Sequence, residues 1–244
     1  LLSRGLGDVY KRQVIASELL LPTSQWLGWL LYAVVLGWAL WRSPWLELFS
    51  DQRRQHLLFG TVLALFLLWL VRRDFASGLS FHFIGMTAVT LLLDWPLAVL
   101  GGFAAQLGLL ALGRLDLFAL GVNGMLLVVV PVAITEFCAL QVERRQPRNL
   151  FVYIFCCGFF PAALAALACL LGGLAVLWHD GLYAMPPWLD DFVGYLWLVM
   201  FPEAFINGML VTGLVVFYPD WLETFNRTRY LSAPWKDGGP DGPP

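Results

Sequence analysis

The sequence predicts an all-α, polytopic integral membrane helix bundle of about seven transmembrane helices. Of its 244 residues, 59% are hydrophobic and only 13% are charged, whereas soluble domains average about 45–50% apolar and about 25% charged residues. The apolar residues gather in long runs, and a helix needs about 20 of them to cross a bilayer. Because too little polar surface remains to coat a soluble globule, we expect the chain to lie in a membrane.

Seven apolar runs, separated by charged or turn-rich breaks, give the expected spans. The third and fourth runs are short and are separated only by Asp94-Trp95-Pro96, so a re-entrant hairpin is the alternative for this pair. The sixth run is long enough to tilt. In chain order the runs are 26–41, 56–71, 81–93, 97–112, 117–138, 150–178 and 202–218.

The two ends of the chain differ from the rest. Residues 1–13 include a polar stretch that fits nothing downstream, and we predict that they are a scar of cloning or sequence assembly, so that the natural amino terminus is missing. Residues 14–235 form the single transmembrane domain that we expect. Residues 236–244 are polar and rich in glycine and proline, which predicts a disordered tail.

Basic residues predict how the bundle is oriented. Counted over the expected loops and the tail, nine lie on one side of the membrane and three on the other. The positive-inside rule places the richer side in the cytoplasm. We therefore expect a multi-pass protein of the cell inner membrane, with its amino terminus outside and its carboxyl terminus in the cytoplasm. The nine are Arg42, Arg53, Arg54, Arg144, Arg145, Arg148, Arg227, Arg229 and Lys236, and the three are Arg72, Arg73 and Arg114.

Four polar residues in the expected spans are candidates for a site, because polar groups in a bilayer are costly and are functional by default. His82 opens the third span, Asn123 lies about two turns into the fifth, and Glu203 opens the seventh. Asn207 follows Glu203 one turn deeper on the same face. These spans run in one direction, so we predict that the four groups line a single outward-facing polar cavity.

Each candidate also has a purely structural alternative. His82 could bond a backbone carbonyl at the membrane interface. Glu203 follows Pro202 and would cap the beginning of its own helix, where an acid faces the helix dipole. Asn123 and Asn207 could link helices by hydrogen bonds.

The sixth span carries a seam of small residues at helical spacing, which lets another helix approach closely. We predict that the seam docks a second membrane subunit, and internal packing within the chain is the alternative. The seam consists of Ala162, Ala165, Ala166, Cys169, Gly172 and Gly173.

Several chemistries lack their sequence motifs. The chain has only two lysines and no glycine-rich loop ending in Gly-Lys-Ser/Thr, so it has no ATP-binding P-loop. It has no His-Glu-x-x-His and no Gly-x-Ser-x-Gly, which argues against an intramembrane protease or serine hydrolase. Basic patches with interleaved aromatic residues are also missing, so we expect no nucleic-acid partner, and no enzymatic activity.

The chain resembles the permeases of energy-coupling-factor (ECF) transporters of the CbiM kind, the cobalt and nickel capture subunits. The resemblance spans residues 26–231 and rests on "GLSFHFIGMTAVTLLLDWPLAVLGG", "ALGVNGML", "VERRQPRNLFVYIF", "FPEAFINGMLVTGLVVFYPDWLETF" and "TRYL". It implies a substrate-binding subunit that works with a transmembrane coupling subunit and cytoplasmic ATPase subunits. It implies no permanently bound cofactor, with Co²⁺ or Ni²⁺ as the substrate.

The resemblance also implies a set of metal ligands. In metal-binding members these are the free amino terminus, a histidine at the second position and a later histidine in a His-aliphatic-Gly context. Only the last has a counterpart here, His82, so we expect it to bind the metal as a neutral imidazole. The Met-His-Ile start is absent, so either the terminal ligands are lost from this sequence or this branch binds another substrate.

Three functions therefore remain: capture of a transition metal, an accessory membrane scaffold or a permease with a non-metal substrate, and, least supported, an intramembrane enzyme. A polar cavity and a set of polar links between helices look alike in sequence, so the first two stay open.

Overall fold

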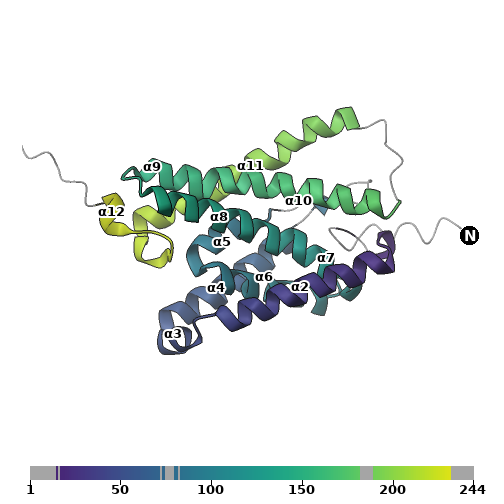
Figure 1. The fold of residues 1–244 in the computed structure, drawn as a ribbon, viewed down its shortest axis with the longest axis horizontal. Coiled ribbons are helices and arrows are strands. Elements are labelled where there is room, and N and C mark those ends of the chain that lie inside the picture. The colour runs from purple at the N-terminus through teal and green to yellow at the C-terminus, as the bar shows by residue number, and fades with distance from the viewer. Residues whose placement is uncertain are drawn as a thin grey trace, which may run out of the picture.

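The computed structural model describes residue 15 and residues 17–71, 73–74, 80–81, 83–181 and 189–231. Within these ranges the chain is a bundle of helices, which confirms the predicted all-α class (Figure 1). The strands found there are two residues each, β1 (Arg73–Asp74) and β2 (Ser80–Phe81), paired antiparallel. The predicted scar at residues 1–13 and tail at residues 236–244 lie outside the described residues.

The described helices follow one another along the chain. In order they are η1 (Ser17–Leu19), α2 (Pro22–Arg42), α3 (Trp45–Ser50), α4 (Gln52–Leu70), α5 (Met86–Leu93), α6 (Trp95–Ala111), α7 (Leu117–Gly124), the π-helical turn η2 (Met125–Val129), α8 (Val130–Arg145), α9 (Leu150–Tyr153), the π-helical turn η3 (Ile154–Phe159), α10 (Phe160–His179), α11 (Leu189–Phe217), η4 (Pro219–Trp221) and α12 (Arg227–Leu231).

Three helical segments of the described chain are long and apolar enough to cross a membrane. These are Leu117–Arg145, Leu150–His179 and Met200–Phe217, and the apolar helix Trp95–Ala111 is shorter. Many large apolar side chains point away from the bundle, for example Trp26 and Trp41, which are 74% and 76% exposed. Such an outer surface suits lipid rather than water, so the membrane assignment holds.

Two of the expected spans have different limits in the structure. The third was expected over residues 81–93, but α5 begins only at Met86, after Gly85 in a left-handed conformation with φ +69°. Its eight residues reach about 12 Å, well short of a bilayer core of about 30 Å. The seventh was expected from Pro202, but α11 already begins at Leu189 and carries Pro202 inside it.

Glycines set the tightest contact between helices, that of α2 with α7. A Cβ at Gly121 would collide with the backbone nitrogen of Trp29, and one at Gly28 would lie 2.8 Å from the backbone nitrogen of Val122. A Cβ at Gly124 would collide with the ring of Tyr32. The two backbones therefore approach more closely than any side chain would allow, which is the use of glycine in membrane helix packing.

Candidate functional site

Glu203 lies midway along α11 and holds the chain just before α5. Its Oε2 accepts a hydrogen bond from the backbone N–H of Ile84 at 2.9 Å, and its Oε1 accepts one from the N–H of Gly85 at 2.8 Å. The residue is only 2% exposed. Both carboxylate oxygens are therefore committed to backbone groups of another element.

Asn207, one turn further along α11, completes the arrangement. Its Nδ2 donates to Glu203 Oε1 at 2.8 Å and to the Glu203 carbonyl at 2.9 Å, and its Oδ1 accepts from the N–H of Ala88 at 3.0 Å. The residue is 1% exposed. The expected shared face of the two side chains is thus confirmed. We call Glu203, Asn207 and the three backbone N–H groups that they hold the interior clamp.

The interior clamp caps the beginning of α5, which the sequence of that helix leaves uncapped. The first N–H groups of a helix have no partner within it, and the residue before α5 is Gly85, which has no side chain to cap them. Glu203 and Asn207 supply the cap from α11, and a carboxylate at a helix amino terminus also interacts favourably with the dipole. Trp69 adds a further anchor, because its Nε1 donates to the Ile84 carbonyl at 3.0 Å.

His82 lies outside the described residues. The interior clamp begins two residues later, at Ile84, and Phe83 between them is half-buried. Among the described residues no group of three or more histidine, cysteine, aspartate or glutamate side chains is placed to hold a metal ion. The prediction that His82 is a metal ligand therefore stays a prediction.

Asn123 is engaged elsewhere, with the beginning of the described chain. Its Oδ1 accepts from the N–H of Ile15 at 3.3 Å and its Nδ2 donates to the carbonyl of Ile15 at 3.2 Å. Asn123 and Ile15 are both fully buried. The asparagine recognises the backbone of this segment, so the structure does not bring it into contact with Glu203 or Asn207.

Two aspartates fix the same segment. Asp116 accepts a hydrogen bond from Ser17 Oγ at 3.0 Å. Asp180 accepts from the N–H of Leu21 at 2.8 Å and from Ser24 Oγ at 2.6 Å, which caps the beginning of α2 from the end of α10. We call Asn123, Asp116 and Asp180 the amino-terminal clamp.

Of the described candidates, Glu203 and Asn207 are joined by a hydrogen bond, whereas Asn123 binds a different segment. Leu126 lies one turn beyond Asn123, in η2, and its carbonyl accepts the Sγ–H of Cys169 at 2.8 Å. The structure therefore places the described candidates in two separate hydrogen-bonded groups.

The family assignment follows from comparison with known proteins. A family model described as the cobalt uptake substrate-specific transmembrane region, CbiM, matches residues 15–221, most of the 244-residue chain. The chain belongs to the CbiM family. No curated protein and no solved structure matches it.

Membership of the CbiM family makes the chain a transmembrane component of cobalt uptake, and the family is one of transporters rather than enzymes. The matched residues begin at Ile15, where the amino-terminal clamp holds the chain, and include the whole interior clamp. Both clamps therefore lie in the part of the chain that resembles cobalt uptake proteins.

The small residues of the sixth span lie largely inside this CbiM chain. Ala162, Ala165 and Ala166 are at most 2% exposed, and Gly173 is buried. Cys169 is half-buried and bonded to Leu126. A Cβ at Gly172 would lie 2.7 Å from the Leu126 side chain. These contacts are those of the internal-packing alternative, and the docking of a second subunit along the seam stays a prediction.

Sequence reasoning missed several residues that the structure makes important. Asp180 follows the end of the sixth predicted span and was not a candidate, yet its side chain is 0% exposed. Gly28 and Gly121 form the tightest helix contact. Gly121 and Gly124 lie three residues apart, whereas the small-residue pattern of close membrane-helix contacts has a spacing of four.

Proposed function

We propose that this CbiM-family chain is the substrate-capture subunit of an ECF-type transporter for cobalt or nickel ions, and that His82 is a ligand to the ion. The observation that carries this proposal is the interior clamp, which fixes the backbone directly after His82 with two carboxylate hydrogen bonds of 2.9 and 2.8 Å. A metal ligand must be held in place by its surroundings, and supporting partners are as much a part of such a site as the ligands.

In this proposal Glu203 and Asn207 are positioning residues that support the ion pocket. The polar atoms of both side chains are already bonded to protein groups, so their role is to orient the backbone that carries His82. Asn123 orients the backbone of the amino-terminal segment in the same way. The family resemblance implies further metal ligands in that segment. The site thus consists of two chain segments, each held by buried side chains.

The ion is moved with the help of other proteins. The chain has no P-loop, so we propose that a transmembrane coupling subunit and cytoplasmic ATPase subunits supply the energy. The protein alone should not hydrolyse ATP, and uptake into cells should require co-expression of these partners. The nine-to-three bias of basic residues supports an amino terminus outside and a carboxyl terminus in the cytoplasm.

The test is binding of Ni²⁺ and of Co²⁺ to the purified protein carrying its natural amino terminus, followed by calorimetry. His82→Ala should abolish binding with the fold intact, because it removes an imidazole ligand. His56→Ala is the matched control, since His56 is exposed and contacts neither clamp, and it should bind as the wild type does.

Two results would contradict the proposal. If His82→Ala binds as tightly as the wild type, the ion site lies elsewhere. If the wild type binds neither ion but still assembles with the coupling subunit, the chain is an accessory scaffold or carries a different substrate.

A further inference from the structure

The last turn of α8 and the loop that leads to α9 carry a cluster of arginines with no partner in the described chain. Arg144, Arg145 and Arg148 are all exposed, and no hydrogen bond or ion pair engages their side chains within the described residues. We call these three residues the arginine loop. Some other arginines are paired with acids, for example Arg54 with Glu47 at 2.7 Å and Arg229 with Glu143 at 2.6 Å. Unlike these, the arginine loop is free to bind a ligand.

The backbone holds the arginine loop in a fixed shape. Gln146 adopts a left-handed conformation with φ 45°, and its N–H donates to the carbonyl of Val142 at 3.0 Å. Pro147 follows and cannot continue the helix. Asn149 then caps α9, accepting from the N–H of Phe151 at 2.9 Å. The chain reverses within a few residues, so little conformational entropy would be lost on binding.

Exposed apolar side chains lie next to the arginine loop on both flanking helices. On α8, Phe137 and Leu140 are 62% and 46% exposed, and Arg144 follows on the same face. On the next helix, Phe151 and Phe155 are 67% and 43% exposed. Exposed apolar side chains of a membrane protein face acyl chains, so a basic group one turn beyond them lies at the level of the headgroups.

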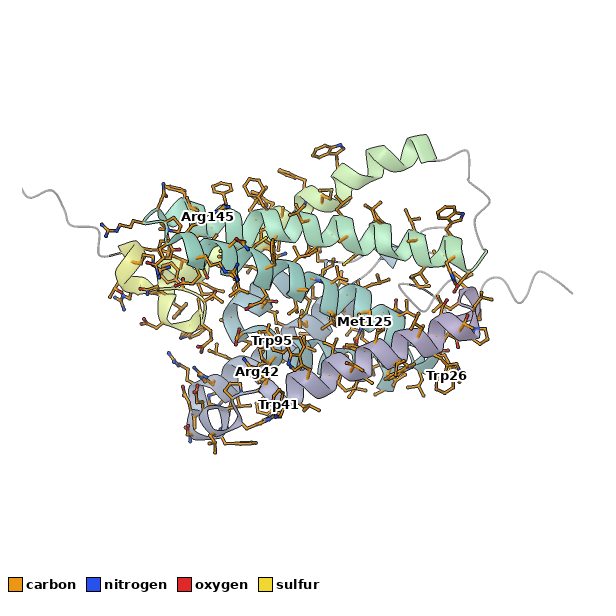
Figure 2. The ribbon with its side chains drawn as sticks, in the orientation of Figure 1. Trp26, Trp41, Arg42, Trp95, Met125 and Arg145 are labelled. Carbon is orange, nitrogen blue, oxygen red and sulfur yellow. The ribbon has the colours of Figure 1, made fainter. Side chains whose placement is uncertain are left out.

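The position of the loop in the bundle agrees with this. Arg42 and Arg145 lie toward one end of the bundle and Trp26 toward the other (Figure 2). Trp41, beside Arg42, is 76% exposed, and exposed tryptophans collect at membrane interfaces. A guanidinium group can donate two parallel hydrogen bonds to a phosphate.

We propose that the arginine loop binds the phosphate of anionic phospholipid headgroups and so ties the α8–α9 hairpin to the membrane surface. This interaction surface is separate from the proposed ion site. Its loss would leave metal binding unchanged, so the two proposals can fail independently.

The test is a titration of the purified full-length protein, in zwitterionic detergent micelles, with phosphatidylglycerol or phosphatidylcholine, with bound lipid counted by native mass spectrometry. R145Q/R148Q should weaken phosphatidylglycerol binding by about 25-fold, or roughly fivefold for each basic side chain near an anionic surface. R145K/R148K keeps the charge and should lose much less.

The matched control is R53Q/R227Q, which removes two exposed arginines already paired with Asp51 and Asp220. It should change binding less than about twofold, because the field of each is already neutralised. If R145Q/R148Q does not yield folded protein, the single variants R145Q and R148Q replace it, each with an expected loss of about fivefold.

Three results would overturn the proposal. The first is unchanged phosphatidylglycerol binding by R145Q/R148Q. The second is equally strong binding of inorganic phosphate alone by the wild type, which would make the loop a site for a free anion. The third is loss of co-purifying coupling subunit with lipid binding intact, which would make the loop a protein-docking surface.

Discussion

The interior clamp joins groups that are almost wholly buried, whereas two arginine pairs each join a partly buried guanidinium group to an exposed carboxylate. Glu203 and Asn207 are 2% and 1% exposed. Arg54 meets Glu47, whose side chain is 68% exposed, and Arg229 meets Glu143, whose side chain is 54% exposed. The distances are similar, so the difference lies in the surroundings and not in the geometry.

That difference decides what each contact contributes. A buried donor that loses its acceptor costs its full desolvation penalty, about 1–3 kcal/mol, while an exposed ion pair contributes about 0–1 kcal/mol and is screened by salt. The arginine pairs also border two hollows of about 370 and 520 Å³, where water can replace a lost partner. Substitutions in the interior clamp should therefore destabilise the fold strongly, whereas substitutions in the arginine pairs should have little effect on stability.

Glu203→Ala should give the largest effect. It leaves the N–H groups of Ile84 and Gly85 without an acceptor and removes one of the two acceptors of the Asn207 amide, which should lower the free energy of unfolding by about 3 kcal/mol or more. Thermal unfolding in detergent measures it. The matched control Glu47→Ala should cost less than about 1 kcal/mol. Equal losses for the two variants would contradict the conclusion that burial determines how much each contact contributes.

Gly121→Ala tests whether disturbing close helix packing lowers stability as much as removing a buried hydrogen bond does. The new Cβ would collide with the backbone of Trp29, and such overpacking costs about 1–3 kcal/mol. Gly37→Ala in α2 is the matched control, because nothing lies within 4 Å of a Cβ there, and it should leave the melting temperature unchanged or raise it. A harmless Gly121→Ala would show that α2 and α7 can separate freely.

These expectations also show what the sequence could provide. The membrane class could be predicted from composition. The shared face of Glu203 and Asn207 could be predicted from their spacing of one helical turn, because it depends on residues close together in the chain. The hydrogen-bond partners of these side chains could not be predicted. Glu203 was weighed as a cap for its own helix, yet it caps α5, more than a hundred residues earlier in the chain.

The same limit applies to Asn123 and Asp180. Each pairs with the backbone of a distant segment, at Ile15 and Leu21. Backbone groups are the same at every position, so no sequence pattern marks where such a partner will be. The predicted spans put Asn123 and Glu203 at a similar depth in the membrane. A similar depth does not tell which residues each side chain binds.

Asp180→Asn should have a smaller and pH-dependent effect. Burial raises the pKa of Asp180, but hydrogen bonds from Ser24, His179 and the Leu21 N–H outweigh it and hold the pKa below its usual value. A carboxyl whose pKa is depressed by folding stabilises the protein above its unfolded pKa, about 3.9, and loses that contribution as the pH falls through the folded pKa.

The loss at pH 7 should be about 1–2 kcal/mol. Melting temperatures of the wild type and Asp180→Asn, compared between pH 7 and pH 3, should therefore converge below about pH 4. A gap that stays constant over this range would mean that Asp180 acts through shape and not through its charge.

Arg229→Gln should have the smallest effect, although its ion pair has the better geometry. The guanidinium makes two bonds to Glu143, of 2.6 and 2.8 Å, but α12 is also held by Tyr230, whose ring lies 5.1 Å from that of Phe225 and 5.4 Å from that of Tyr153. The loss should stay below about 1 kcal/mol and should be smaller in about 1 M salt, where the screening length falls to about 3 Å. Tyr230→Ala, which removes the aromatic contacts, should cost more and be insensitive to salt. If Arg229→Gln instead costs as much as Glu203→Ala in both low and high salt, exposure does not set the strength of these contacts, and the two regions are stabilised in the same way.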